Sequence, residues 1–157
     1  MDTPAMNASV HRLCIALLIL LLFSGCAATQ GDLLLIRDQA YEAYRNRNYD
    51  TAVSKFEYLV SRVPEDGEFW FRLGNSYARS QKPQLAVDAY QKALIRVPAN
   101  EKAWYNMGLV QTETALKTFV DMQQYTQHNS TIGKKGEEMR QGLFDLLGKK
   151  NDQKAKQ

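Results

Sequence analysis

The 157-residue sequence is poor in the residues on which most enzymatic and metal chemistry depends. It has two cysteines, Cys14 and Cys26, and two histidines, His11 and His128. The segment after Cys26 therefore offers no disulfide framework, no thiol nucleophile and no soft metal site. It also lacks a glycine-rich phosphate loop and the GxSxG and HExxH patterns. We therefore expect no enzyme, no cofactor and no metal, and we assign the scattered carboxylates to solvated helix starts.

A charge imbalance along the main part of the chain is also missing. The formal net charge is +3, but residues 32–133 carry twelve basic and twelve acidic side chains. The surplus lies near the end of the chain, at Lys134, Lys135, Lys149, Lys150, Lys154 and Lys156. A nucleic-acid surface should instead run along the folded part, so nucleic acid is not an expected partner. The basic tail, residues 149–157, is predicted to be disordered.

The longest apolar run is too short for a membrane-spanning helix, which needs about 20 apolar residues. Residues 13–23, LCIALLILLLF, follow His11 and Arg12 and precede small residues. This arrangement is typical of a signal peptide, here residues 1–25, and disfavours a permanent transmembrane anchor. Translation from Met6 instead of Met1 would remove Asp2 from this segment, and both starts stay open.

The end of this run resembles the lipobox of bacterial lipoproteins, with the residues Leu22-Phe23-Ser24-Gly25-Cys26. The resemblance implies cleavage before Cys26, acylation of that cysteine with palmitate-type chains, and a lipidated linker over residues 26–32. Ala27 is not the aspartate that retains such proteins at the inner membrane, so the resemblance implies the periplasmic face of the outer membrane. A plain secretory signal stays open, because Gly25-Cys26-Ala27 is itself a small-residue cleavage site.

A repeat of thirty-four residues dominates the rest of the sequence. One copy contains Trp70, Leu73, Gly74, Tyr77, Ala86, Tyr90 and Pro98. The preceding copy has Ala40, Ala52, Phe56 and Pro64 in the same places, and the following copy has Trp104, Met107 and Gly108. These residues resemble the tetratricopeptide repeat family, from residue 33 to about 113. The resemblance implies an all-α fold over residues 33–148: a short α-solenoid of two full helical hairpins, a degenerate third and a C-terminal capping helix.

Helical periodicity and terminal signals predict where the helices lie. Asp50 and Asn100 are suitable N-caps, and Pro64 and Pro98 should end the helices before them. Gly74 is expected where the two helices of one hairpin cross closely. The predicted helices cover about residues 33–46, 51–63, 67–80, 83–97 and 101 onward.

The repeat decays in its third copy, where Gln111, Val120 and Gln124 replace the expected tyrosine, alanine and aromatic residue. This stretch is predicted to be either one continued helix or a hairpin with an irregular turn near Thr114. A final amphipathic segment between Gly136 and Gly148 places one apolar face at Met139, Leu143, Leu146 and Leu147. It either caps the third repeat, which we favour, or docks on a partner.

The resemblance also implies where a partner binds, because the first helix of each tetratricopeptide hairpin lines a concave groove. The groove residues in this sequence are Arg37, Tyr41, Phe71, Arg72, Asn75, Lys102, Tyr105 and Asn106. Basic groups among aromatics and amides suit an acidic, partly extended segment or a peptide terminus, although they could also form an ordinary solvated face. Tyr41 replaces an asparagine of the family's carboxylate clamp, so no such clamp is expected.

Two functions follow from these features. The first is a membrane-anchored protein–protein interaction module, an adaptor or assembly factor of the bacterial cell envelope, attached to the membrane through lipid on Cys26. The second is a cell-wall-associated lipoprotein that binds peptidoglycan or another glycan, with Tyr41, Phe71 and Tyr105 stacking on sugar rings.

Overall fold

A computed structural model describes residues 31–126 and 130–154 of the chain. The predicted signal peptide, Cys26 and His128 lie outside these residues. The described part contains helices and no strands: a helix over residues 31–45, followed by α2 (Tyr49–Arg62), α3 (Gly67–Arg79), α4 (Pro83–Arg96), α5 (Glu101–Tyr125) and α6 (Thr131–Lys154). Within these residues, no helix is both long enough and apolar enough to span a membrane.

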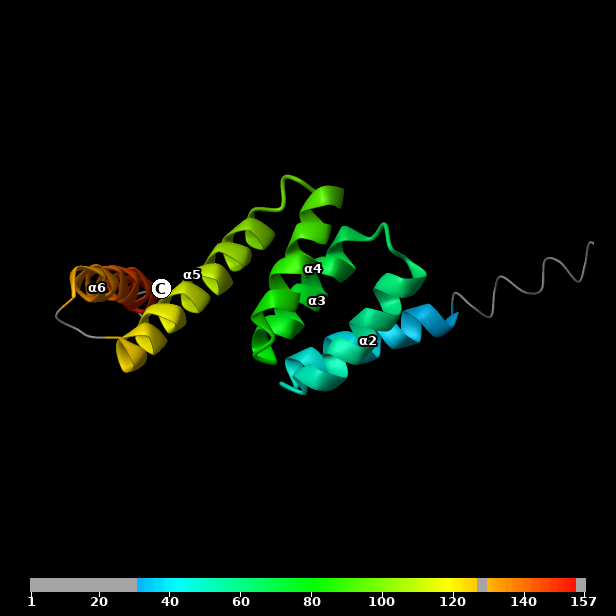
Figure 1. Cartoon of the computed structure of the whole chain (residues 1–157). Helices are drawn as coiled ribbons and strands as arrows, with labels where there is room; N and C mark the ends of the chain where they lie inside the picture. The colour runs from blue at the N-terminus through cyan, green and yellow to red at the C-terminus, as the bar shows by residue number, and fades with distance from the viewer. Residues whose placement is uncertain (1–30, 127–129, 155–157) are drawn as a thin grey trace, which may run out of the picture.

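The helices pack mainly against their neighbours along the chain. The α2 helix contacts α3, α3 contacts α4, α4 contacts α5, and α5 contacts α6, so that the helices follow one another across the molecule (Figure 1). The most extensive pairing is between α3 and α4, the two helices of the hairpin whose residues match the repeat pattern most fully. Nearest-neighbour packing of this kind defines an α-solenoid, which confirms the predicted fold class.

The helix ends agree with the predicted boundaries to within two residues, and most of the terminal signals act as expected. The Asn100 side chain caps α5 by accepting a hydrogen bond from the backbone N–H of Ala103 at 3.0 Å. Pro83 occupies the first turn of α4. The predicted cap at Asp50 is wrong, because α2 begins earlier and Asn48 accepts the hydrogen bond from the backbone N–H of Thr51.

The core is centred on the crossing of α3 and α4. Tyr90 is 1% exposed, and a Cβ atom added to Gly74 would lie 2.6 Å from two of its ring carbons. This distance is too short for any side chain, so glycine allows the two helices to approach closely, as predicted. Phe56, on α2, is fully buried and meets the ring of Tyr41 edge-on, with the ring centroids 5.5 Å apart. Other core residues include Ala40, Ala52, Leu59, Leu73, Ala86, Ala93 and Met107.

The turns inside the first two hairpins share one backbone conformation. Arg47 and Gln81, thirty-four residues apart, have φ angles of 60° and 58°, in the left-handed region that ends a helix. The third copy has Ala115 at this place, followed by Leu116 and Lys117, and α5 continues through it. Alanine, leucine and lysine favour a helix, and neither a proline nor a capping residue interrupts them. Of the two predicted alternatives, the single continued helix is therefore the one observed.

The α6 helix packs beside the distal half of α5 (Figure 1). Gly136 allows close contact, because a Cβ atom there would lie 2.8 Å from the sulfur of Met122. Leu143 and Leu147 are half-buried, whereas Met139 and Leu146, predicted on the same packed face, are 53% and 64% exposed. The helix therefore covers α5 with only part of the predicted apolar face.

The prediction of a disordered tail from residue 149 is wrong for its first part. The α6 helix continues through residues 149–154 and ends at Lys154. This stretch reads KKNDQK and contains neither glycine nor proline, so no strong stop signal follows Gly148.

Candidate partner-binding groove

The predicted groove residues lie on three helices that occupy equivalent places in successive repeats. Arg37 and Tyr41 belong to the helix of residues 31–45, Phe71, Arg72 and Asn75 to α3, and Lys102, Tyr105 and Asn106 to α5. The structure links all of these residues except Arg37, either through direct contacts or through one shared surface depression. Arg37 instead pairs with its neighbour Asp38 at 2.9 Å and stays at the edge of this surface.

Arg72 connects the first helix to α3. Its guanidinium carbon lies 5.2 Å from the centroid of the Tyr41 ring and 5.6 Å from that of Phe71, which are cation–π distances. Its Nε atom donates a hydrogen bond to Glu68 at 2.6 Å. Burial, followed by the charge of Glu68, raises the pKa of Tyr41. Arg72 is thus largely engaged within the protein, and its charge is partly neutralised before any partner arrives.

A buried polar network connects α3, α4 and α5. The side-chain oxygen of Asn75 accepts one hydrogen bond from the Tyr90 hydroxyl and another from the Asn106 side-chain amide, both at 2.8 Å. Asn75 is 9% exposed and Asn106 is half-buried. These two bonds use both acceptor positions of the Asn75 oxygen. The network therefore holds Asn106 in a defined orientation at the surface of α5.

Four of the predicted residues, together with one that was not predicted, line a depression between α3 and α5 with a volume of 460 Å³. Phe71 is 6% exposed and contributes apolar surface, whereas Tyr105 is 55% exposed. The lining is completed by Lys102, Asn106 and the unpredicted Glu101. Glu101 directly precedes Lys102 in the first turn of α5, and this neighbourhood is the sequence signal that could have identified it. The depression therefore combines a carboxylate, an amine, a hydroxyl and an amide with the apolar surface of Phe71.

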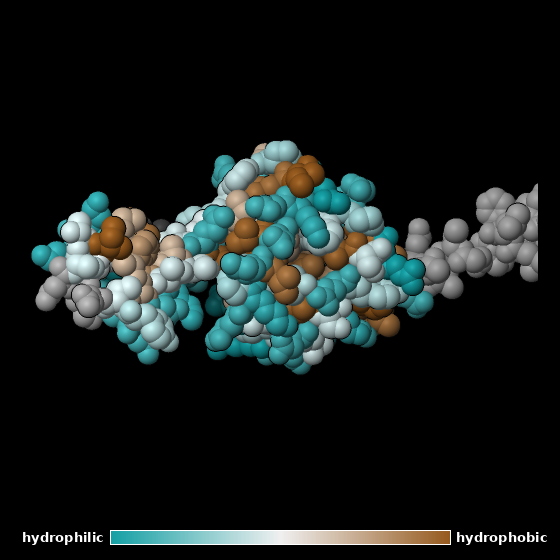
Figure 2. All heavy atoms as spheres, viewed as in Figure 1, coloured by the Kyte–Doolittle hydropathy of each residue, from teal (hydrophilic) through white to brown (hydrophobic). Residues whose placement is uncertain are grey.

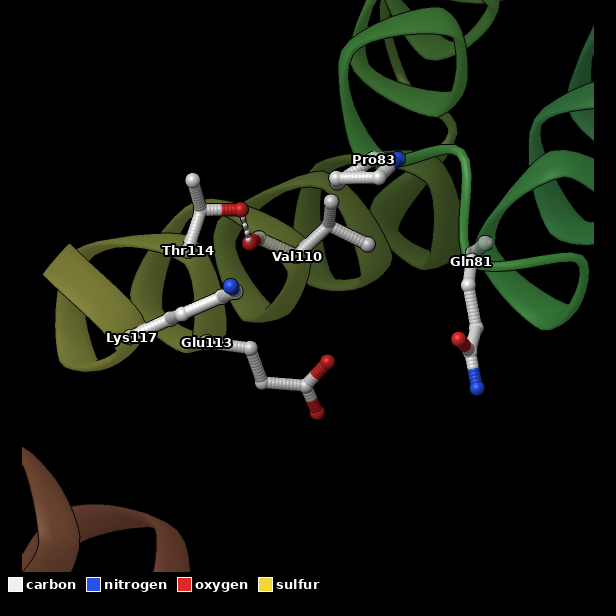
Figure 3. A pocket seen from close by; sticks show the side chains of 7 residues that line it. Gln81, Pro83, Val110, Glu113, Thr114 and Lys117 are labelled. Carbon is white, nitrogen blue, oxygen red and sulfur yellow. Dashed lines mark hydrogen bonds between the residues drawn. The ribbon is translucent and has the colours of Figure 1, made fainter. Parts of the chain in front are cut away.

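A second depression, which the sequence did not indicate, lies where α5 leaves the repeat stack. Its volume is 340 Å³, and it lies between the turn from α3 to α4 and the middle of α5 (Figure 3). Its lining residues are Ala78, Gln81, Pro83, Val110, Glu113, Thr114 and Lys117. It depends on α5 continuing as a helix where the repeat pattern has a turn, so no local sequence signal marks it.

Residues able to bind a metal ion do not gather anywhere in residues 31–126 and 130–154. No group of three or more histidine, cysteine, aspartate or glutamate side chains there has a suitable arrangement. The groove itself presents hydrogen-bonding, charged and aromatic groups.

Comparison with known proteins agrees with this architecture. Residues 37–110 match the family model described as Tetratricopeptide repeat. The match covers slightly less than half of the chain, and it agrees with the thirty-four-residue repeat and the helical hairpins described above.

Two relatives match part of this chain. The chain is 41% identical over 66 residues to the peroxisomal targeting signal receptor of Candida albicans, a match that covers 42% of this chain and 11% of the relative. It is 30% identical over 69 residues to the general transcriptional corepressor ssn6 of Schizosaccharomyces pombe, covering 42% of this chain and 6% of the relative. The matched segment thus spans about a tenth or less of the length of either relative.

A solved structure extends the fold comparison beyond the repeats. A chain of the CopN-Scc3 complex superimposes with a TM-score of 0.53 and 23% sequence identity, covering 80% of this chain and 72% of the other. At this identity the likeness concerns the fold alone.

Proposed function

We propose that this chain is a lipid-anchored adaptor or assembly factor of the bacterial cell envelope that binds a segment of a partner protein between α3 and α5. The observation that carries the proposal is the depression formed by Phe71, Glu101, Lys102, Tyr105 and Asn106. It combines an apolar surface with an amide that is held in place through Asn75. Such a site suits an extended peptide, whose backbone needs hydrogen-bonding partners and whose side chains need apolar contact.

The chemistry of the bound segment is less acidic than the count of basic groove residues suggests. Arg37 is paired with Asp38, and Arg72 with Glu68. Lys102 has no ion pair within the described residues, but it lies beside Glu101 at the depression. The best fit is an extended segment or chain terminus with one acidic group near Lys102 and an apolar side chain at Phe71.

Membrane attachment and peptide recognition rest on different observations. Lipid attachment through Cys26 is supported by the lipobox-like sequence of residues 22–26, and the periplasmic face of the outer membrane is supported by Ala27, which stands where lipoproteins of the inner membrane have an aspartate. Recognition of a peptide is supported by the repeat region and by the Candida albicans relative, which is named as a receptor for a targeting signal.

The glycan alternative receives less support from the geometry. Phe71 is 6% exposed, and the guanidinium of Arg72 lies over the ring of Tyr41. Only Tyr105, at 55% exposed, presents a large aromatic surface among the three rings proposed to stack on sugars. A polypeptide is therefore the better ligand for this surface.

Affinity purification from detergent-solubilised envelopes tests the proposal. The wild-type protein should recover a specific protein partner, and both Lys102→Glu and Asn106→Ala should reduce that recovery. Lys135→Glu is the matched control, because Lys135 is exposed on α6, away from the depression. Recovery of no specific partner, or equal recovery with all variants, would contradict the proposed groove. Co-sedimentation of the wild-type protein with purified peptidoglycan would instead favour the glycan alternative.

A further inference from the structure

The start of α5 repeats the face that α3 presents to α4. Trp104 and Gly108 stand thirty-four residues after Trp70 and Gly74. The Trp70 indole donates a hydrogen bond to the carbonyl oxygen of Pro64 at 2.8 Å, and the Trp104 indole donates one to the carbonyl oxygen of Pro98 at 2.9 Å. The two tryptophans are therefore held in the same way, and α5 is oriented as the first helix of a third hairpin.

On α3, the second helix of the hairpin covers this face. Tyr90 of α4 lies against Gly74, where it occupies the space that a side chain would need. The Lys92 amine lies 4.5 Å and the Arg96 guanidinium carbon 5.5 Å from the centroid of the Trp70 ring. The small residues of α4, among them Ala86 and Ala93, are fully buried.

On α5, no helix of the described residues covers the same face. A Cβ atom added to Gly108 would meet nothing within 4 Å, and Trp104 is 55% exposed. The α6 helix packs farther along, where Gly136 meets Met122 (Figure 1). We name the stripe of Trp104, Gly108, Gln111 and Ala115 the open α5 face; these residues recur at the i, i+4, i+7 and i+11 positions of one helix side.

A depression continues this face toward α4. Its volume is 470 Å³, and it is lined by Gln84, Val87, Asp88, Gln111, Thr114, Ala115 and Thr118. Gln111 and Ala115 belong both to the depression and to the open α5 face. The lining holds one carboxylate, Asp88, and no basic side chain. Figure 2 shows that apolar residues reach the surface over the repeat body and again near α6, with hydrophilic residues between them.

We propose that the open α5 face is a docking site for an amphipathic helix of a partner protein, which takes the place of the missing second helix of the third hairpin. The way α4 seats on α3 defines the chemistry of this helix. In α4, four residues that seat on α3 are Ala86, Tyr90, Ala93 and Arg96. The partner helix therefore needs a small residue at position i, a large aromatic at i+4, a small residue at i+7 and a basic residue at i+10. The aromatic ring lies on Gly108, and the basic group lies over Trp104.

The chain's own last helix does not meet these requirements. The glycines of α6 are its candidates for the first small residue, and the aromatic should follow four residues later. The residues at those positions, after Gly133, Gly136, Gly142 and Gly148, are Glu137, Arg140, Leu146 and Asp152. Only Leu146 is large and apolar, and Lys149 follows it where a small residue is required. Neither α6 of the same molecule nor that of a second copy therefore reproduces the seat of α4. Among the described residues, no basic group lies over Trp104, and the depression holds a single carboxylate; both observations favour a basic helix from another protein.

A peptide with the sequence of residues 83–97 is the probe, because α4 is the helix whose seat is known. The peptide carries Gln91→Glu and Ile95→Lys, at two positions exposed in α4, and condensation of the new carboxyl group with the new amine, with loss of water, forms a lactam bridge that holds it helical. Fluorescence anisotropy with the full chain should show saturable binding, and Gly108→Leu should weaken it at least tenfold, by roughly the 1.4 kcal/mol that a tenfold change represents. A peptide carrying Tyr90→Ala should lose affinity to a similar degree.

Two protein variants serve as controls. Gly142→Leu places the same side chain at an open glycine of α6 and should bind the peptide like the wild type. Lys102→Glu, which alters the groove between α3 and α5, should also bind normally, so the two sites can fail independently. Helical circular dichroism of Gly108→Leu should match that of the wild type, since the added side chain meets open space.

The absence of saturable binding would overturn the proposal, as would equal affinity for the wild type and Gly108→Leu. Self-association of the wild-type chain that Gly108→Leu abolishes would also overturn it, because the occupant would then be a second copy. Analytical ultracentrifugation of both proteins without peptide distinguishes that outcome.

Discussion

The close crossing of α3 and α4 makes Gly74→Leu the most informative single substitution for the fold. A Cβ atom at this position would lie 2.6 Å from two ring carbons of Tyr90, which is 1% exposed and cannot move into solvent without opening the core. Overpacking of this kind costs about 1–3 kcal/mol. Displacing Tyr90 would also break its hydrogen bond to Asn75 and leave a buried polar group unsatisfied, which costs about 1–3 kcal/mol more.

Leucine recovers part of this loss, because it favours a helix over glycine by about 1 kcal/mol. The net destabilisation is then about 1–5 kcal/mol, a large fraction of the 5–15 kcal/mol typical of a small domain. At roughly 4 °C for each kcal/mol, the melting temperature should fall by about 4–20 °C. Damage to the middle of a solenoid also weakens its interfaces with the helices on both sides.

Thermal unfolding followed by circular dichroism at 222 nm, the helical wavelength, is the measurement. Gly108→Leu is the matched control, since Gly108 occupies the same place in the next repeat and a side chain there meets nothing within 4 Å. It should melt at or slightly above the wild-type temperature. Gly148→Leu, on α6, should be similarly mild. A Gly74→Leu protein that melts with the wild type, or a Gly108→Leu protein that melts as early as Gly74→Leu, would refute the assigned crossing.

Three further predictions address the anchor, the tyrosines and a helix cap. Cys26→Ser should abolish lipid attachment and leave unprocessed precursor, because an alcohol is not the substrate of thiol acylation; normal processing with detergent-sensitive membrane attachment would contradict the lipoprotein assignment. Burial raises the pKa of Tyr77 and of Tyr90 above the ordinary 10.0, so these hydroxyls ionise in the unfolded chain before they ionise in the folded one. Their contribution to stability is therefore complete below about pH 10 and is lost as the pH rises further. Urea unfolding should therefore show falling stability above about pH 10 and a smaller fall in Tyr77→Phe; an unchanged slope would exclude this cause. Asn100→Ala removes the cap of α5 and should cost about 1 kcal/mol in the same assay, whereas no loss would show that the bond to Ala103 contributes nothing.

Local sequence signals were sufficient wherever one interaction decides the structure. Asn100 and Pro83 mark helix starts because a cap or a preset φ angle acts within one turn. The cap at α2 was misassigned because Asn48 and Asp50 are both good caps and lie two residues apart, so residue type does not distinguish them.

The candidate groove was only partly visible in the sequence. The resemblance to tetratricopeptide repeats, carried along the chain by the repeat spacing, implied the helices that line it and four residues of its depression. It could not show that Arg72 is occupied by Glu68 and by the rings of Tyr41 and Phe71, because those contacts depend on side chains from two helices.

The sequence by itself determined the helical class, the thirty-four-residue period and the glycine at the tightest crossing, because each depends on residue types at fixed spacing along one chain. Tertiary structure alone decided whether the face of the third repeat is covered. Trp104 and Gly108 match the first helix of a hairpin and so predict a second helix after a turn. Helix-favouring residues at 115–117 instead continue α5 past the expected turn, and α6 packs on the distal half of α5. Gly108 is left uncovered as a result, since whether a helix face is covered depends on where the next helix lies in space.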